Sequence, residues 1–119
     1  MSESLPTIDP QAIDNLRQLS PGDDDAFVKE ICGIFVADTP NRLAELDAGL
    51  ANNDVGGFVR AAHSIKGSAA NIGATQLGAA AAQLETESKT TPLPGLTARI
   101  DAVKAEYARV EAELRKLTA

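Results

Sequence analysis

The sequence predicts an all-α protein, an antiparallel up-down-up-down four-helix bundle with an extra short helix at its N-terminus. Alanine and leucine dominate the apolar residues, aromatic residues make up 3% of the chain, and tryptophan is absent, which favours helices over strands. Apolar residues recur in gaps of three and four, the spacing of a helix with one buried face. The connections between these segments are short, so neighbouring helices should run antiparallel. The 119 residues suit a single domain over residues 9–119, preceded by a loose segment over residues 1–8.

The short first helix has clear boundary signals. Asp9 and Pro10 are a typical N-cap and first helical residue. Ser20-Pro21-Gly22 ends the helix. We expect it to cover one end of the bundle.

Three consecutive aspartates, residues 23–25, precede the second helix. A calcium loop would need a different spacing and a distal glutamate. Carboxylates that cap a helix and face its dipole explain them better. The apolar phase continues across Pro40, so we expect one long helix from about Asp24 to Ala51, bent near Asp38. Its apolar residues are Phe27, Ile31, Ile34, Phe35, Leu43, Leu46 and Leu50.

Three further segments complete the bundle. Residues 52–54 end the long helix and cap the third, which Gly73 ends. Thr75 should cap a fourth helix that runs to about Lys89, and a loop over residues 90–95 leads to the last helix. The apolar residues of the third helix are Val55, Phe58, Ala62, Ile65, Ala69 and Ile72, and those of the last are Leu96, Ile100, Val103, Tyr107, Val110, Leu114 and Leu117.

Charge and composition exclude several classes of function. The net charge of −6 argues against nucleic acid and membrane surfaces, which attract basic proteins. No apolar run approaches the ~20 residues of a membrane span, and residues 1–9 lack the features of a signal peptide, so we expect a cytoplasmic protein. The single cysteine, Cys32, has no partner for an internal disulfide and suits a small buried position.

The only histidine, His63, lies about 130° around its helix from the centre of the apolar stripe, and should therefore face water. Lys66 and Gly67 follow at i+3 and i+4, on the same surface, and Arg60 and Ala70 flank it. An exposed imidazole is a competent nucleophile toward activated phosphorus. A lysine one turn away can neutralise phosphoryl oxygens, and a glycine leaves room for a partner.

Other chemistries fit this patch less well. A serine nucleophile needs a facing base, one histidine cannot hold zinc, and no glycine-rich nucleotide loop is present. An ordinary surface histidine beside a lysine remains an alternative, because such spacing is common.

The run from His63 to Gly73, HSIKGSAANIG, resembles the H-x-x-K-G-x-x-x-x-x-G signature of histidine-containing phosphotransfer (HPt) domains. The resemblance extends over most of the chain, from about Asp9 to Ala119. It implies a carrier without autokinase activity that is phosphorylated on His63, with Lys66 stabilising the phosphoryl group and Gly67 giving access. It also implies receiver domains and a hybrid sensor kinase as partners, Mg²⁺ supplied by the receiver, and no cofactor or metal of its own.

At one position the chain departs from the family pattern. Many members place a glutamine on the next helix, near the histidine, where this chain has Glu85. A carboxylate there could orient the imidazole N–H but would repel a phosphoryl group. The role of Glu85 therefore stays open.

The sequence leaves the following hypotheses. The first is a stand-alone, monomeric phosphorelay intermediate. The second is a four-helix binding module that sequesters a receiver or kinase without carrying phosphate. A hydrolase using His63 as a base lacks a second catalytic group. For a phosphorelay protein we expect an apolar docking ring around His63 from the first helix and the start of the second. Partner contacts are expected from Val59, Arg60, Ser64 and Ala70.

Overall fold

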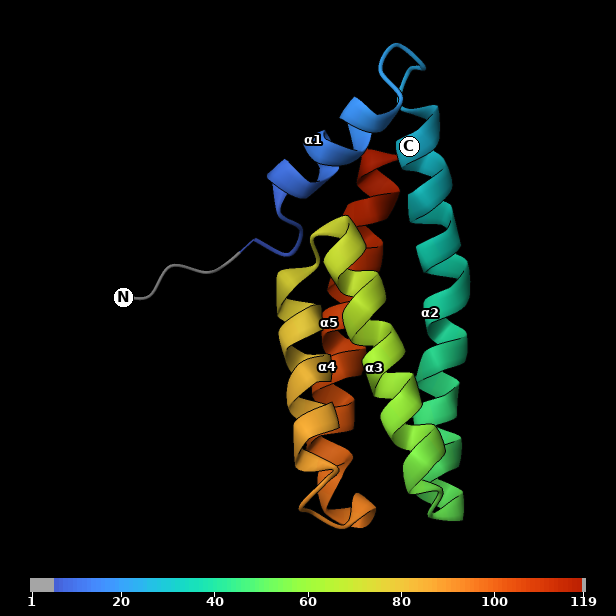
Figure 1. Cartoon of the computed structure of the whole chain (residues 1–119), viewed down its shortest axis with the longest axis vertical. Helices are drawn as coiled ribbons and strands as arrows, with labels where there is room; N and C mark the ends of the chain where they lie inside the picture. Colours follow the sequence, from blue (N-terminus) through green and yellow to red (C-terminus); the bar gives the residue numbers. More distant parts are fainter. Residues whose placement is uncertain (1–5, 119) are drawn as a thin grey trace, which may run out of the picture.

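Four long helices lie side by side, and a short helix packs across one end of them (Figure 1). The structure is a computed structural model that describes residues 6–118. The helices are α1 (Pro10–Leu19), α2 (Ala26–Asn52), α3 (Val55–Ile72), α4 (Thr75–Glu87), a 3₁₀ turn η1 (Leu93–Leu96) and α5 (Thr97–Leu117), with no strand among the described residues. The chain runs down α2, up α3, down α4 and up α5 (Figure 1), which confirms the predicted bundle.

The start of α1 is fixed to the turn between α3 and α4. Asp9 is the N-cap, and its carboxylate accepts a hydrogen bond from the backbone N–H of Gln11. The backbone N–H of Asp9 donates to the carbonyl of Gly73 at 2.8 Å. Ile8 packs against the core, while residues 1–5 of the predicted loose segment lie outside the described residues.

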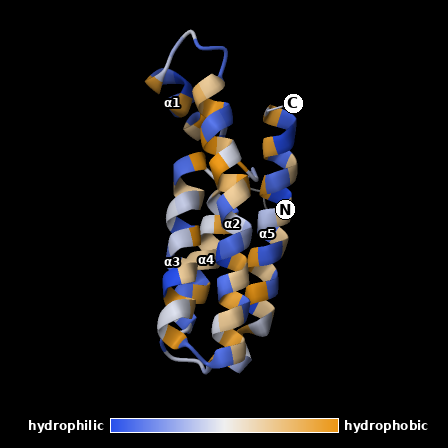
Figure 2. Cartoon of the chain, turned by 90° about the vertical axis from the view of Figure 1, so that its right-hand side faces the viewer, coloured by the Kyte–Doolittle hydropathy of each residue, from blue (hydrophilic) through white to orange (hydrophobic). Residues whose placement is uncertain are grey.

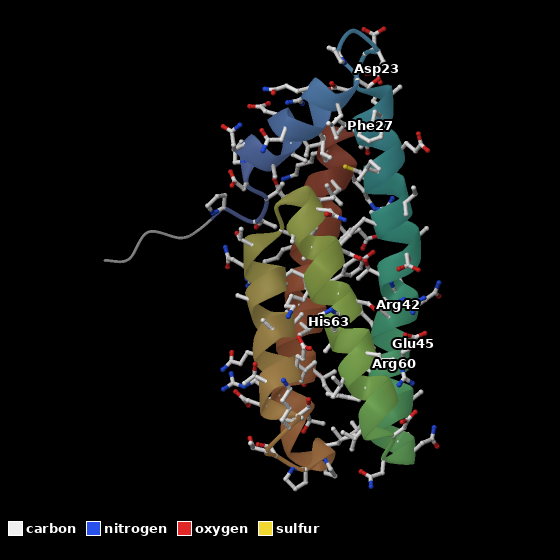
Figure 3. All side chains as sticks on the ribbon, in the orientation of Figure 1. Asp23, Phe27, Arg42, Glu45, Arg60 and His63 are labelled. Carbon is white, nitrogen blue, oxygen red and sulfur yellow. The ribbon has the colours of Figure 1, made fainter. Side chains whose placement is uncertain are left out.

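Helix α2 begins at Ala26, two residues later than predicted. Asp24 and Asp25 cannot be helical because both have left-handed backbones, with φ of 56° and 64°. The cap comes from Asp23, whose carboxylate accepts from the N–H of Phe27 at 3.1 Å (Figure 3). The aspartate run therefore caps the helix as predicted, through its first member.

Helix α2 continues through Pro40 without a break. A proline inside a helix has no N–H to give to the carbonyl four residues earlier, which here belongs to Val36. The hydroxyl of Tyr107, from α5, donates to that carbonyl at 3.1 Å. A side chain from the far end of the chain thus supplies the donor that the proline lacks.

The junctions of α3 follow the sequence signals, and the start of α4 does not. Asp54 caps α3 by accepting from the N–H of Gly57, and Gly73 ends it with φ of 74°. The prediction that Thr75 caps α4 is wrong, because Thr75 is already its first residue and Ala74 precedes it without a side-chain cap. Ala74 is fully buried, so this position is used for packing.

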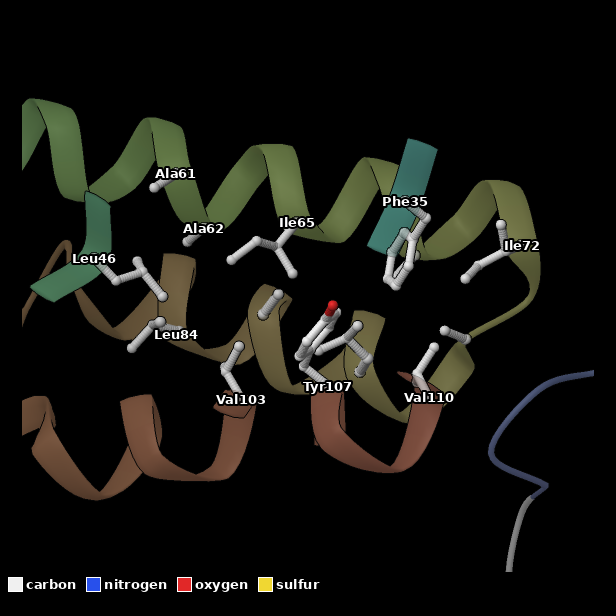
Figure 4. Packing of buried hydrophobic residues seen from close by; sticks show 14 of the residues in the cluster. Phe35, Leu46, Ala61, Ala62, Ile65, Ile72, Leu84, Val103, Tyr107 and Val110 are labelled. Atoms are coloured by element: carbon white, nitrogen blue, oxygen red, sulfur yellow. The ribbon is translucent and has the colours of Figure 1, made fainter. Parts of the chain in front are cut away.

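The core runs the length of the bundle, between the four long helices (Figure 4). Hydrophilic and hydrophobic residues alternate along each helix (Figure 2), as expected for helices with one buried face. Cys32 is buried, as predicted. The largest fully buried side chains are those of Phe58, Leu46, Ile65, Ile72, Leu77, Leu84, Leu93, Leu96, Ile100, Leu114, Val103 and Val110.

Three residues assigned to the apolar stripes of the long helices are exposed. Val55 and Leu117, each at a helix end, are 46% and 44% exposed. Ile34 is 57% exposed because the buried face of α2 passes through Val28, Cys32 and Phe35. Ile34 lies about 130° around the helix from the centre of this stripe, beside the buried face of α2.

Candidate phosphoryl-transfer site

His63 lies near the middle of α3 and points away from the core. Its side chain is 65% exposed, whereas its neighbour Ala62 and Ile65 are completely buried. Their burial fixes the rotation of α3 about its axis, so the imidazole is presented to solvent from a rigid support. The predicted exposure of His63 is confirmed.

Glu85 joins His63 to Lys66 across the α3–α4 interface. The neighbouring Leu84 is completely buried, which sets the rotation of α4 and directs the next residue toward α3. One oxygen of Glu85, Oε2, lies 3.1 Å from Nδ1 of His63. The other, Oε1, lies 2.9 Å from Nζ of Lys66, and the Glu85 side chain is only 16% exposed.

The electrostatics of this cluster fix the roles of its atoms. The hydrogen bond from Lys66, followed by that from His63, holds the pKa of Glu85 below its ordinary value, although partial burial opposes this. Glu85 is therefore an ionised carboxylate and can only accept hydrogen bonds. A neutral His63 ring must then carry its proton on Nδ1, which leaves the lone pair of Nε2 free on the exposed side.

The surface beyond the ring is open. A Cβ built at Gly67 would meet no atom within 4 Å, so this position leaves free space beside His63. Ala70 is exposed and Val59 is half-buried. The neighbours of the ring along α3 are therefore small, or lie partly below the surface.

Arg60 and Ser64 lie on another side of α3. Both line a groove of about 400 Å³ between α2 and α3, together with Arg42 and Glu45 (Figure 3). Arg42 is paired with Glu45 at 2.9 Å and with Asp38 at 3.3 Å. The structure thus separates Arg60 and Ser64, which line this groove, from Lys66, which pairs with Glu85 of α4.

The sequence analysis missed the surface around Ile34. Ile34 lines a shallow cavity of about 150 Å³ between α2 and α3, with Ser68 and Asn71 on its α3 side. These two residues follow His63 by one and two helical turns. The exposure of Ile34 could have been predicted from the sequence, because Ile34 does not lie on the helical stripe formed by Val28, Cys32 and Phe35.

Two further classes of site find no support in residues 6–118. No group of three or more histidine, cysteine, aspartate or glutamate side chains is placed to hold a metal ion within this range. Over the same residues, no helix combines the length and the hydrophobicity needed to cross a bilayer.

Comparison with known proteins places the chain in a family. Residues 30–113 match the family model of the Hpt domain. The protein belongs to the Hpt domain family. No curated protein sequence matches the chain.

Solved structures that resemble this Hpt protein include the following two. Histidine-containing phosphotransfer protein B (HptB) from Pseudomonas aeruginosa PAO1 is 27% identical, with a TM-score of 0.86 over 97% of this chain and 96% of that one. The HPT domain of an Hpt sensor hybrid histidine kinase from Shewanella is 17% identical, with a TM-score of 0.72 over 93% and 92% of the two chains. At this low sequence identity, the similarity to the Shewanella domain shows only that the two chains share a fold.

Family membership gives this Hpt protein a role in histidine phosphotransfer within phosphorelays. Hpt domains act as phosphotransfer carriers, and they interact with receiver domains and hybrid kinases. The cluster of His63, Lys66 and Glu85 lies within the matched residues 30–113.

Proposed function

We propose that this protein is a stand-alone phosphorelay intermediate that carries a phosphoryl group on His63 between aspartyl-phosphorylated receiver domains. The observation that carries the proposal is the His63–Glu85 contact of 3.1 Å at Nδ1. With Nδ1 hydrogen-bonded to Glu85, the other ring nitrogen, Nε2, is left as an exposed nucleophile.

Capture of the phosphoryl group follows from this geometry. The lone pair of Nε2 attacks the phosphorus, the bond between phosphorus and the aspartyl oxygen breaks, and the aspartate leaves as a carboxylate. Lys66, 40% exposed at its side chain, neutralises phosphoryl oxygens as they approach. The receiver supplies the Mg²⁺. Release to a second receiver is the same step in reverse.

The surroundings of His63 suit a protein partner. The open space at Gly67 admits the receiver's active site, and Val59 and Ala70 contact its rim. Arg60 and Ser64, on the groove side, meet the receiver at a second point of contact. We place the protein in the cytoplasm as a monomer.

Phosphoryl transfer from a ³²P-labelled receiver tests the proposal directly. An acid-labile, base-stable label that is present on the wild-type protein and absent from a His63→Gln variant is on His63, the single histidine of the chain. We expect a His63→Gln variant to keep its fold and receiver affinity and to take no label. Lys66→Met should take label at least tenfold more slowly, since one charge near a developing phosphoryl charge contributes about 1.4 kcal/mol or more. A His63→Gln variant that labels as fast as wild type would refute the proposal.

The same experiment separates the carrier from a binding module. A module that only sequesters receivers would bind the phosphorylated receiver and leave its label in place. Size-exclusion chromatography of the wild-type protein reports the oligomeric state.

A further inference from the structure

Arg60 carries a positive charge near His63 that residues 6–118 leave unpaired, and the inference drawn from it rests on the function proposed above. Arg60 is exposed, and no ion pair or hydrogen bond with another described residue holds its guanidinium. Its Nη1 atom lies 3.4 Å from the position that a Cβ would take at Gly56, about one turn earlier on the surface of α3. The guanidinium is therefore available to a group that approaches from outside.

Lys66, by contrast, presents little net charge to the ring. Its Nζ lies 2.9 Å from Oε1 of Glu85, whose side chain is only 16% exposed, so a positive and a negative charge lie side by side. Lys66 can still donate a hydrogen bond to a phosphoryl oxygen, because an ammonium group has three N–H donors. Catalysis of phosphoryl transfer depends largely on neutralising the charge of the phosphoryl oxygens, and the Lys66–Glu85 pair leaves that charge uncompensated.

Arg60 and Lys66 lie on opposite sides of His63. Each is one helical turn from the histidine, about 60° around α3 from it, with Cβ atoms about 5–6 Å from that of His63. Lys66 faces α4 through Glu85, whereas Arg60 lines the groove between α2 and α3 (Figure 3). Helical side chains lean toward the N-terminus of their helix, so the imidazole lies over the turn that contains Arg60. A phosphoryl group on Nε2 is then within reach of both cations.

We propose that Arg60 is a second catalytic residue, which binds phosphoryl oxygens on the α2 side of His63 and supplies the positive charge that Glu85 cancels at Lys66. As Nε2 uses its lone pair to form the N–P bond, the bond from phosphorus to the donor breaks and its electron pair leaves with the donor. Two N–H groups of the guanidinium donate to two phosphoryl oxygens throughout, a geometry that arginine favours. Arg60 neither gains nor loses a proton in this step.

The carboxylates of the groove do not compete for Arg60. Glu45 is paired with Arg42 at 2.9 Å. Asp54 caps α3, because its carboxylate accepts from the backbone N–H of Gly57 at 3.0 Å. Arg60 can therefore turn toward the phosphoryl group without breaking an ion pair within the described residues.

The test compares a small phosphoryl donor with a protein donor. Phosphoramidate has no docking surface, so its rate of transfer to His63 reports on the chemistry and not on contacts with a receiver. Phosphohistidine formation is followed by ³¹P NMR in the full-length wild type, Arg60→Gln and Arg60→Lys. Arg99→Gln is the matched control, since it removes the same charge at a residue of α5 that pairs with Glu87 at 3.1 Å. Thermal melts establish that the variants are equally folded, and a phosphorylated receiver is the second donor.

We expect Arg60→Gln to form phosphohistidine about tenfold more slowly than wild type with both donors, the effect of one charge aimed at the phosphoryl oxygens. Arg60→Lys keeps the charge and should stay within about threefold of wild type, and Arg99→Gln should match it. In the Glu85→Gln background the charge of Lys66 is no longer cancelled. There, Arg60→Gln should slow the reaction with phosphoramidate by less than about threefold.

Two results would overturn the inference while leaving the proposed function intact. One is an Arg60→Gln variant that matches wild type with phosphoramidate and is slow only with the receiver, which would make Arg60 a docking contact alone. The other is an equal cost of Arg60→Gln with and without the Glu85 carboxylate, which would show that Arg60 does not compensate for it. Failure of wild type to form phosphohistidine with either donor would instead remove the proposed function.

Discussion

Replacing Tyr107 with phenylalanine removes one hydroxyl and leaves the aromatic ring in place. The ring packs against Phe35 with centroids 5.9 Å apart, and phenylalanine preserves that contact. What is lost is the hydrogen bond to the carbonyl of Val36, at 3.1 Å. Tyr107 is only 7% exposed, so the carbonyl loses its donor in a largely dry environment. We expect a loss of about 1–2 kcal/mol in the free energy of unfolding, the cost of an unsatisfied carbonyl.

Changing Pro40 as well isolates the contribution of the Tyr107 hydroxyl. Pro40→Ala restores an N–H four residues after Val36, and so supplies a donor from within α2. It should stabilise the protein by about 1–3 kcal/mol, since a proline inside a helix costs about 3 kcal/mol. In this background, Tyr107→Phe should cost less than about 0.5 kcal/mol, because the Val36 carbonyl already has a partner.

Urea denaturation followed by far-UV circular dichroism measures all four proteins of this double-mutant cycle. Tyrosine fluorescence is unsuitable, because Tyr107 is the only tyrosine. In thermal melts, each 1 kcal/mol corresponds to about 4 °C for a domain of this size. An equal cost of Tyr107→Phe with and without Pro40 would show that the hydroxyl does not compensate for the proline.

Burial raises the pKa of Tyr107, so its contribution to stability is present below the ordinary tyrosine pKa and is lost as pH rises through the raised value. Alkaline urea titrations should show this loss in wild type and not in the phenylalanine variant. Ile34→Asp should slow phosphoryl transfer from a receiver while changing stability by less than about 0.5 kcal/mol, as expected for a surface site. Leu117→Asp, at a comparably exposed leucine in the last turn of α5, is its control, and equal transfer rates in the two variants would argue against docking at Ile34. Gly67→Ala should stabilise α3 by about 0.5–1 kcal/mol, because glycine is a poor helix former, yet slow transfer by filling the space beside the ring. Gly73→Ala should destabilise the protein by about 2 kcal/mol or more in the same denaturation assay, since φ is 74° and the new Cβ would lie 2.5 Å from a side-chain carbon of α1.

The helices could be predicted from the sequence, because a helix that buries one face repeats its apolar residues every three to four positions. The sequence was also sufficient at Asp9, Asp54 and Gly73, where the backbone groups at a helix end need a particular side chain or a left-handed residue. It failed at Thr75, because capping and packing compete at that junction. The buried Ala74 shows that packing prevailed.

Periodicity identifies an apolar side chain without saying which neighbour covers it. Ile34 has the chemistry of a core residue, but its position around α2 leaves it facing solvent. The contact between His63 and Glu85 joins residues 22 positions apart, and depends on the relative rotation of α3 and α4. Counting along the chain places Glu85 near the ring. Only the packed helices show that one carboxylate serves both His63 and Lys66.

The hydrogen bond from Asp9 to Gly73 bears on where this domain can be cut. The family match begins at residue 30, yet α1 ends well before that point and covers the turn in which α3 becomes α4. A protein expressed from residue 30 would keep the family signature and lose the helix against which Gly73 packs. It would remove one of the two donors to the Gly73 carbonyl, which also accepts from the N–H of Thr75 at 2.9 Å. It would also expose apolar side chains to water at the end of α3, two to three turns from His63. For fusions, truncations or chimaeras, the unit to preserve therefore begins at Ile8.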